Sequence, residues 1–438
     1  MSSTPRDGFT NKFGVIAAAA GSAVGLGNIW RFPYVAGENG GGAFLLVYLG
    51  FILLIGLPVM LSELLIGRKA QKNVFGAFRT LAPEKPVFMS VGIMGVGAAF
   101  MILAFYAVVA GWTMEYTYLA ITNSLSDMNS TQLSAFFKEF KSSTSGPLLW
   151  MGIFMVLTAG IVVGGVKNGI EKYTKILMPL LLVIIIVLCI KSVSLDGAEA
   201  GLSFLFKPDF SKLSGSVILE ALGQAFFSLS IGMGVIATYG SYIQKKENLM
   251  FTAFSVSFAD SMIAVLAGVA IFPAVFAFGI DPSSGPGLVF ETLPNVFNSM
   301  QSGYIFSVAF FILLVIAALT SSVSLLEVVV AYFTEELKLN RKKSTLIAAG
   351  SIAILGALCV VSADVFSFFD WTSSNILLPL GGILIAVFVG WILGHKKMKE
   401  ELEAHGGKAY FMGVLIIILK FVAPIAISAV FLHGLGLL

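Results

Sequence analysis

Three observations predict an all-α membrane protein with eleven transmembrane helices. The chain of 438 residues is 57% hydrophobic and only 12% charged, whereas soluble domains carry about 25% charged residues. Its mean hydropathy is +0.94. A span needs roughly 20 apolar residues, and stretches of that kind occur at about 12–36, 42–67, 88–122, 147–165, 172–192, 217–243, 250–278, 302–334, 345–362, 368–394 and 409–435.

The distribution of Lys and Arg predicts the orientation of these spans. If the N-terminus is cytoplasmic, the segments on the inner side hold 20 of the 27 basic residues, and those on the outer side hold five. Cytoplasmic loops carry such an excess of positive charge. An odd number of spans then places the C-terminus outside. Arg31 and Lys420 are the basic residues that lie within spans.

The same composition argues against several classes of function. Cys189 and Cys359 lie in apolar runs, and His395, His405 and His433 lie near expected loops or the C-terminus. No nucleophile–histidine pair or metal cluster is therefore expected at membrane depth, which argues against an enzyme. The basic residues lie in short loops, so no nucleic-acid partner is expected. The expected partners are the lipid bilayer and a small solute.

The first span contains an interruption that lipid would not tolerate. Gly21, Gly25 and Gly27 precede Asn28, and Arg31 and Pro33 follow. Freed backbone groups cost several kcal/mol each in hydrocarbon, so such a segment must face protein or a water-filled cavity.

The sixth span is interrupted in a similar way, at Ser228-Leu229-Ser230-Ile231-Gly232-Met233-Gly234. The two interruptions are five spans apart, and an odd repeat length inverts the second unit relative to the first. Paired broken helices of this kind indicate a transporter with inverted repeats and a binding site at mid-membrane. Close packing of small residues is the alternative, but it does not explain the clustered Asn and Ser.

The fifth span contains Gly169 and, after nine intervening residues, Pro179 near its cytoplasmic end. Both residue types weaken a helix, so this part of the span is expected to be a weak helix. Unwinding there would open a water path from the cytoplasm. An ordinary helix start with a tolerated proline explains the sequence equally well.

The ends of a broken helix carry partial charges and unpaired backbone groups that can bind ligands. Half-helix N-termini suit a carboxylate, and half-helix C-termini present carbonyls that suit Na⁺. Asp260 is an acid well inside the seventh span, and acids at that depth are usually functional. Glu63, late in the second span, is expected to hydrogen-bond the backbone of a neighbouring broken helix, and Glu327 is expected to do similar structural work.

Four motifs carry a resemblance that covers nearly the whole chain. NIWRFPY (28–34), ENGGGAF (38–44), GQAFFSLSIGMG (223–234) and ALTSSVSLLE (318–327) resemble the neurotransmitter:sodium symporter family. The resemblance implies two inverted five-helix repeats plus one C-terminal helix, in a bacterial inner membrane. The expected divisions are 1–11 (cytoplasmic segment), 12–192 (first repeat), 193–216 (extracellular connection), 217–394 (second repeat) and 395–438 (cytoplasmic loop and eleventh helix).

The resemblance also implies two sodium sites and one substrate pocket. The first sodium site would use Ala23, Asn28, Ser228 and Asp260. The second would use Gly21, Val24, Ala317, Thr320 and Ser321. The pocket would comprise Ala23, Gly25, Leu26, Gly27, Ile102, Tyr106, Phe227, Ser228, Ser230, Met233, Ser321 and Leu325, with Tyr106 and Phe227 as an aromatic lid.

Two gates are implied in the same way. Arg31 and Asp370 resemble an outer ionic gate. Arg6 and Glu335 resemble an inner one, supported by Ser241 and Tyr242.

Three positions narrow the expected function. Gly25 stands where monoamine carriers have an aspartate, which favours an α-amino acid as substrate. Asp260 resembles an acidic replacement that makes chloride unnecessary. Met233 is flexible, and with Gly25 and Ile102 it favours large apolar or aromatic substrates over glycine.

The expected function is Na⁺-coupled import of hydrophobic or aromatic L-amino acids by alternating access. Two alternatives stay open at this point. One is a proton-coupled amino acid transporter with the same broken-helix fold, and the other is an amino-acid sensor that does not transport. The oligomeric state is not predicted.

Overall fold

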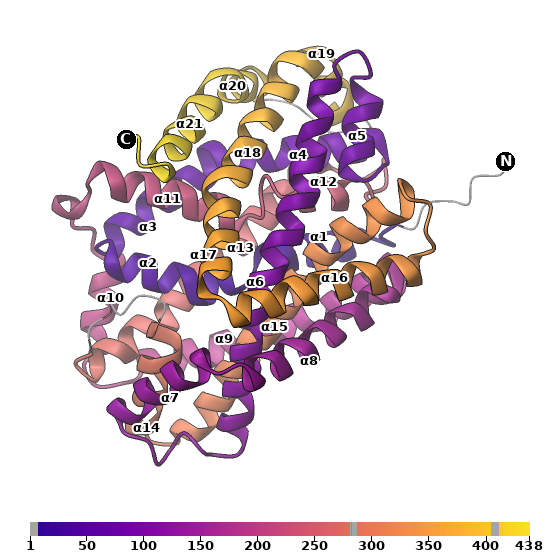
Figure 1. Ribbon diagram of the computed structural model, residues 1–438. Helices are drawn as coiled ribbons and strands as arrows, with labels where there is room; N and C mark the ends of the chain where they lie inside the picture. Colours follow the sequence, from indigo (N-terminus) through magenta and orange to yellow (C-terminus); the bar gives the residue numbers. More distant parts are fainter. Residues whose placement is uncertain (1–7, 281, 283–286, 404–410) are drawn as a thin grey trace.

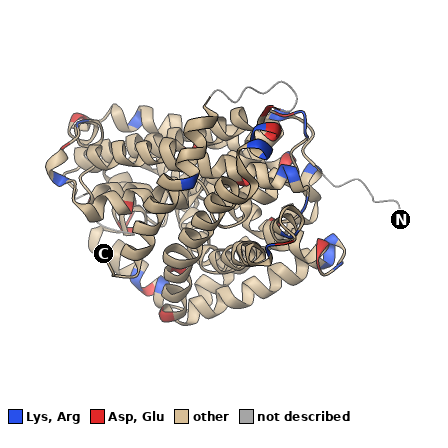
Figure 2. Ribbon diagram, turned by 90° about the horizontal axis from the view of Figure 1, so that it is seen from above, with Lys and Arg blue, Asp and Glu red and all other residues tan. Residues whose placement is uncertain are grey.

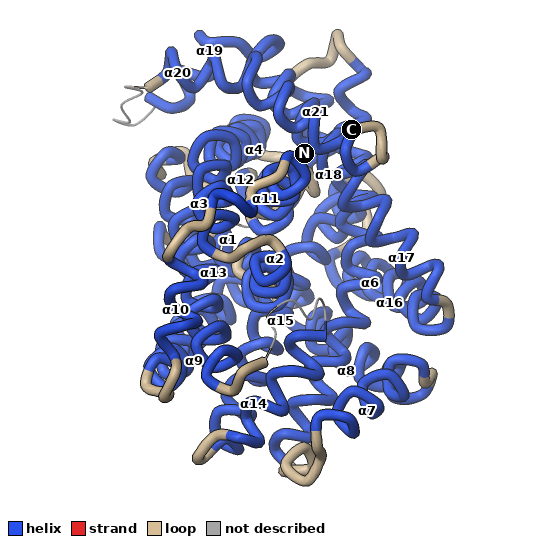
Figure 3. The backbone as a smooth tube through the Cα atoms, turned by 90° about the vertical axis from the view of Figure 1, so that its left-hand side faces the viewer, coloured by secondary structure: helices blue, strands red, loops and turns tan. Residues whose placement is uncertain are grey.

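The computed structural model describes residues 8–280, 282, 287–403 and 411–438. Within these ranges the chain is helical with short connections and no strand (Figure 1, Figure 3). The described residues contain nine helices that are long and apolar enough to cross a membrane, and one bent pair makes a tenth. The helices α11 and α12 form the remaining span, which is broken between them. The predicted all-α membrane fold is confirmed.

The first five spans lie between residues 12 and 193. Their helices are α1 (Lys12–Ala23) and α2 (Phe32–Glu38), α3 (Gly42–Phe51) and α4 (Leu57–Ala70), α6 (Met89–Ile121), α8 (Ser145–Val163), and α9 (Lys172–Val193).

The later spans begin at residue 215. Their helices are α11 (Gly215–Ser228) and α12 (Val235–Gly240), α13 (Leu249–Ala277), α15 (Gly303–Glu335), α16 (Arg341–Val361), α17 (Ala363–Thr372) with α18 (Leu378–Val387) and α19 (Gly394–Glu403), and finally α20 (Met412–Ile417) with α21 (Ala423–Gly434).

Four shorter helices lie in the connections, where the hydropathy pattern gives no signal. They are α5 (Val74–Leu81), α7 (Ser130–Ser142), α10 (Ala198–Phe206) and α14 (Leu293–Ser299). Figure 2 shows most of the ribbon free of charged residues, as a bilayer-spanning protein requires. The long helices α6 and α15 pack along each other, and α1 contacts α13, α15 and α9.

The first span breaks where the sequence predicts. The Asn11 side chain accepts a hydrogen bond from the Gly14 amide and starts α1. The helix ends at Ala23 because Val24 is extended, with ψ of 98°. The segment that resumes at Gly27 is bent by 47° relative to α1. The last carbonyls of α1 therefore lack intrahelical partners.

The sixth span breaks between Ser228 and Val235. Ser230, Gly232 and Gly234 have φ of 56°, 82° and 75°, a region that favours glycine. The carboxylate of Glu63 accepts hydrogen bonds from the backbone amides of Gly232 (2.7 Å) and Ala237 (3.2 Å). The expected role of Glu63 as an acceptor for broken-helix backbone is confirmed.

The fifth span starts with a wide π-type turn over Val166–Glu171, before α9. Gly165 has φ of 85°, and Pro179 lies inside α9. A Cβ at Gly169 would overlap the carbonyl oxygen of Ile161. A glycine is therefore required for this close packing, and unwinding of the segment stays a prediction.

Candidate functional site

The two interruptions face each other in the middle of the molecule. The Ser230 hydroxyl, in the break of the sixth span, donates to the carbonyl oxygen of Ser22 at 3.0 Å. The Ser321 hydroxyl of α15 donates to the same carbonyl at 3.1 Å. Both serines thus use a carbonyl that the end of α1 leaves free. The breaks and α15 therefore form one site.

A first cluster of oxygen atoms surrounds Asn28. Its side-chain amide donates to the Ser228 hydroxyl at 3.0 Å and to the Asp260 carboxylate at 2.7 Å. The Ser228 hydroxyl also donates to Asp260, at 2.7 Å. The side-chain oxygen Oδ1 of Asn28 accepts from the Gly25 backbone amide at 3.0 Å. Asn28 and Asp260 are fully buried.

Tyr48 completes this first cluster, although the sequence analysis did not single it out. Its hydroxyl lies 3.1 Å from the Ser228 hydroxyl and 3.3 Å from the Asp260 carboxylate. An aromatic residue inside an apolar run is indistinguishable from a core residue in the sequence. Gln224, inside the motif at 223–234, was not singled out either; its side-chain amide donates to the Gly27 carbonyl at 2.9 Å.

A second cluster of oxygen atoms lies between α1 and α15. The Thr320 hydroxyl lies 3.1 Å from the Ala317 carbonyl oxygen and 3.5 Å from that of Val24. The Ser321 hydroxyl lies 3.5 Å from the Gly21 carbonyl oxygen. All five residues expected for a second sodium site therefore lie together. Their oxygens are neutral, which suits a hard monovalent cation.

A small cavity of about 30 Å³ lies beside both clusters. Ten of the twelve residues expected for the substrate pocket line it, and Ser22 adds to them. The lining residues are Ser22, Ala23, Gly25, Gly27, Ile102, Tyr106, Phe227, Ser230, Met233, Ser321 and Leu325. Leu26 and Ser228 are not among them, but the Leu26 amide donates to the Tyr106 hydroxyl at 3.3 Å.

Gly25 keeps one wall of this cavity free of side-chain atoms. A Cβ at this position would overlap the Ser321 hydroxyl and lie 3.2 Å from the Tyr106 hydroxyl. The residue therefore fits only as glycine unless its neighbours move. In this structure the Ser321 hydroxyl therefore occupies the place beside Gly25 that the sequence assigned to a carboxylate.

The outer pair, Arg31 and Asp370, is not in ion-pair contact within the described chain. The Arg31 guanidinium lies over the ring of Phe227, 4.6 Å from its centroid. Asp370 accepts from the Ser374 hydroxyl at 3.3 Å. In this structure Arg31 thus covers Phe227, one of the residues that line the cavity.

The inner pair falls partly outside the described residues, because Arg6 belongs to residues 1–7. Glu335 accepts from the backbone and side-chain amides of Asn73, at 2.8 and 3.0 Å. The Tyr242 hydroxyl donates to Glu327 at 2.7 Å, and the Ser241 hydroxyl donates to the Thr238 carbonyl at 2.5 Å.

Glu327 also forms an ion pair with Arg341, at 2.5 Å between Oε2 and Nη2. The buried carboxylate of Glu327 therefore has a cationic partner. The partners of Glu327 are thus the side chains of Tyr242 and Arg341, and not broken-helix backbone as for Glu63.

Comparison with known proteins shows which protein family has this fold and site. The sequence pattern of the Sodium:neurotransmitter symporter family matches residues 6–139 and 128–436. The chain belongs to this family. The symporter is 39% identical over 443 residues to the sodium-dependent transporter YhdH of Bacillus subtilis, covering 98% of both chains. It is 26% identical over 456 residues to human sodium- and chloride-dependent GABA transporter 2, covering 91% of this chain and 75% of the relative.

A solved structure is similar to this symporter over its whole length. The crystal structure of MhsT in complex with L-phenylalanine matches with a TM-score of 0.91 and 48% identity, covering 98% of this chain and 100% of that one. The eleven-helix fold expected from the sequence is thus the fold of a solved protein. The family consists of sodium symporters, so the protein is a membrane transporter and not an enzyme.

Proposed function

We propose that this symporter imports hydrophobic or aromatic L-amino acids together with Na⁺, by alternating access and without chloride. The single observation that carries the proposal is the cavity beside the two oxygen clusters, to which Gly25 contributes no side chain and which has apolar walls at Ile102, Met233 and Leu325. The L-phenylalanine named with the similar structure of MhsT supports an aromatic substrate.

In this proposal the first Na⁺ is held by Ala23, Asn28, Ser228, Asp260 and the carboxylate of the substrate. The substrate carboxylate would lie beside Gly25, and the Ser321 hydroxyl would shift to admit it. Asp260 supplies a fixed negative charge next to this cation. Because buried cations need compensation, that charge removes the need for a chloride ion.

The second Na⁺ is assigned to the carbonyl oxygens of Gly21, Val24 and Ala317 with the hydroxyls of Thr320 and Ser321. These oxygens come from the break of the first span and from α15. A cation between them would fix the lower half of the first span against α15. Loss of this cation would free α1 to move, which is the opening step toward the cytoplasm.

The side chain of the substrate is assigned to the part of the cavity near Ile102, Met233 and Leu325. Tyr106 and Phe227 would close over it, with Arg31 on the outer face of Phe227. Asp370 is proposed to pair with Arg31 when the outer side closes further. Arg6 and Glu335, with Ser241 and Tyr242, are proposed as the inner gate.

The proposed membrane is the bacterial inner membrane, with the N-terminus cytoplasmic and the C-terminus outside. The excess of Lys and Arg on one side of the spans supports this orientation.

The test is uptake of a panel of labelled amino acids into proteoliposomes. We expect phenylalanine, tyrosine, tryptophan and leucine to be taken up ahead of glycine, driven by an inward Na⁺ gradient and equally well when gluconate replaces chloride. Uptake driven by a pH gradient in sodium-free buffer would instead indicate proton coupling. Binding without any uptake would indicate a sensor, and preference for glycine would overturn the assigned substrate class.

A further inference from the structure

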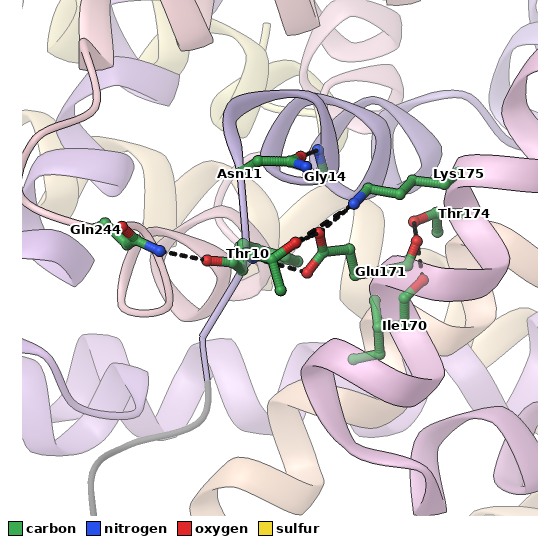
Figure 4. A network of polar contacts seen from close by, with 9 residues as sticks. Thr10, Asn11, Gly14, Ile170, Glu171, Thr174, Lys175 and Gln244 are labelled. Atoms are coloured by element: carbon green, nitrogen blue, oxygen red, sulfur yellow. Dashed lines mark hydrogen bonds and ion pairs between the residues drawn. The ribbon is translucent and has the colours of Figure 1, made fainter.

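The start of α1 is fastened to the start of the fifth span by one carboxylate, that of Glu171 (Figure 4). Its Oε2 accepts from the backbone amide of Thr10 at 2.9 Å. Its Oε1 accepts from the Thr10 hydroxyl and lies 2.5 Å from the ammonium of Lys175. Thr10 and Glu171 are 161 positions apart, so this contact joins two distant parts of the chain.

The contact is built into the packing of both helices. Glu171 is 2% exposed and ends the wide turn over Val166–Glu171 that precedes α9. On the opposite side, α1 has Gly14, where a Cβ would overlap the Glu171 carboxylate. The glycine therefore leaves the space in which this carboxylate reaches α1.

The same segment of chain is held on its other side by the end of the sixth span. The Phe9 amide donates to the Tyr242 carbonyl at 3.2 Å, and the Gln244 side chain donates to the Phe9 carbonyl at 2.9 Å. The Phe9 ring is buried, with its centroid 5.7 Å from that of Tyr239. These contacts are between neutral groups, whereas those of Glu171 are charge-assisted and therefore stronger.

Lys175 allows the contact between Thr10 and Glu171 to break and form again at low cost. It lies one turn after Glu171 on the same helix, and 27% of its side chain is exposed. If Thr10 moves away, Glu171 keeps its cationic partner, so no unpaired charge is left buried. Release of a carboxylate that stays paired costs far less than release of one that becomes isolated.

We propose that Glu171 is a positioning residue that holds the N-terminal end of α1 in its closed position. In this proposal α1 moves outward only when the contact between Thr10 and the segment 164–171 breaks. The proposal rests on the proposed function, because alternating access requires α1 to move. In a substrate-free, sodium-free protein, Glu171 would set how often that opening occurs. The wide turn and its glycines would then move together with α1.

The test is hydrogen–deuterium exchange on the full chain in detergent, in sodium-free buffer. In Glu171→Gln we expect exchange about tenfold faster than in the wild type for peptides covering residues 9–20 and 161–175, because a charged acceptor has become neutral. Added Na⁺ and L-phenylalanine should restore part of this protection, since ligands favour the arrangement that binds them. Exchange in α21, which packs against α11 and α18, should stay unchanged.

Gly14→Ala provides a second route to the same result. It leaves Glu171 in place but fills the space that its carboxylate occupies, so it should raise exchange in the same two regions. Glu84→Gln, at an exposed acid, and Gly152→Ala, at a glycine with open space around it, are the matched controls. Both should exchange like the wild type.

Two results would overturn the proposal. One is exchange in residues 9–20 within twofold of the wild type in both variants. The other is faster exchange spread over the whole chain, including α21, which would mean general destabilisation. If the wild type shows no Na⁺-dependent uptake, the proposed function fails, but the exchange comparison in sodium-free buffer still decides the role of Glu171.

Discussion

The side-chain amide of Asn28 lies 2.7 Å from the carboxylate of Asp260, 232 positions further along the chain. Asn28 belongs to the break of the first span, and Asp260 lies in the middle of α13. An acid this deep in a membrane protein is costly unless it is paired or hydrogen-bonded. Here three polar side chains, from Asn28, Ser228 and Tyr48, surround it, and this relationship underlies the first prediction.

Asp260→Asn should raise the Na⁺ concentration for half-maximal uptake by about tenfold, because it removes the charge that balances the cation, a change of about 1.4 kcal/mol. Chloride should then stimulate uptake by the variant but not by the wild type. Uptake at graded Na⁺, in chloride and in gluconate, measures both effects. Asp127→Asn, at an exposed acid, is the control. Chloride-dependent uptake by the wild type would contradict this prediction.

Gly25→Ala should weaken amino acid binding by tenfold or more. The new Cβ would overlap the Ser321 hydroxyl, and overpacking of this kind costs about 1–3 kcal/mol. Equilibrium binding of L-phenylalanine to the purified protein in Na⁺ tests it. Gly50→Ala, at a glycine with nothing within 4 Å, should bind like the wild type. An unchanged affinity in Gly25→Ala would mean that the substrate does not use this wall.

Thr320→Val should weaken the Na⁺ dependence of uptake while leaving the shape of the site nearly the same. The variant loses the hydroxyl that lies 3.1 Å from the Ala317 carbonyl and 3.5 Å from that of Val24. We expect a severalfold rise in the Na⁺ concentration for half-maximal uptake. Thr122→Val, at an exposed threonine, is the matched control. Na⁺ dependence equal to that of the wild type would remove Thr320 from the proposed second site.

Glu63→Gln should destabilise the fold by about 1–3 kcal/mol, because its carboxylate is the acceptor for two backbone amides in the broken sixth span. The measurement is the unfolding temperature in detergent, which we expect to fall. Glu84→Gln, an exposed acid near the end of α5, should leave it unchanged. An unfolding temperature for Glu63→Gln equal to that of the wild type would show that water can replace this carboxylate.

Pro179→Ala tests whether the fifth span unwinds during transport. The proline removes one helical hydrogen bond near the start of α9, so its replacement should stiffen the helix. We expect uptake to slow severalfold while amino acid binding in Na⁺ stays within twofold of the wild type. An unchanged rate of uptake would argue that the helix does not unwind at Gly169–Pro179.

Much of the fold could be predicted because the bilayer imposes a simple rule. A span must be long, apolar and helical, so the eleven spans follow from hydropathy and from the breaks at Gly25 and Ser230. The short helices α5, α7, α10 and α14 could not be predicted in this way. They lie outside the apolar core, where helix formation depends on packing rather than on lipid.

The candidate site was predictable only where a motif marked it. Asn28 and Ser228 stand in or next to interruptions that would be costly in an ordinary span, so they attract attention in the sequence. Thr320 lies inside the continuous helix α15, and only the motif at 318–327 marks it. Tyr48 lies in an apolar run, where a core residue looks the same. Its hydroxyl matters only because folding places it 3.3 Å from Asp260.

The amino-acid sequence by itself determined the membrane fold, the two broken helices and the family. Each of these depends on local composition or on a short run of residues, which the linear chain carries in full. The tertiary structure alone decided which oxygens share a cluster and that Arg31 covers Phe227 rather than pairing with Asp370. It also decided that Glu171 holds Thr10, because contacts between residues far apart depend on how the helices pack.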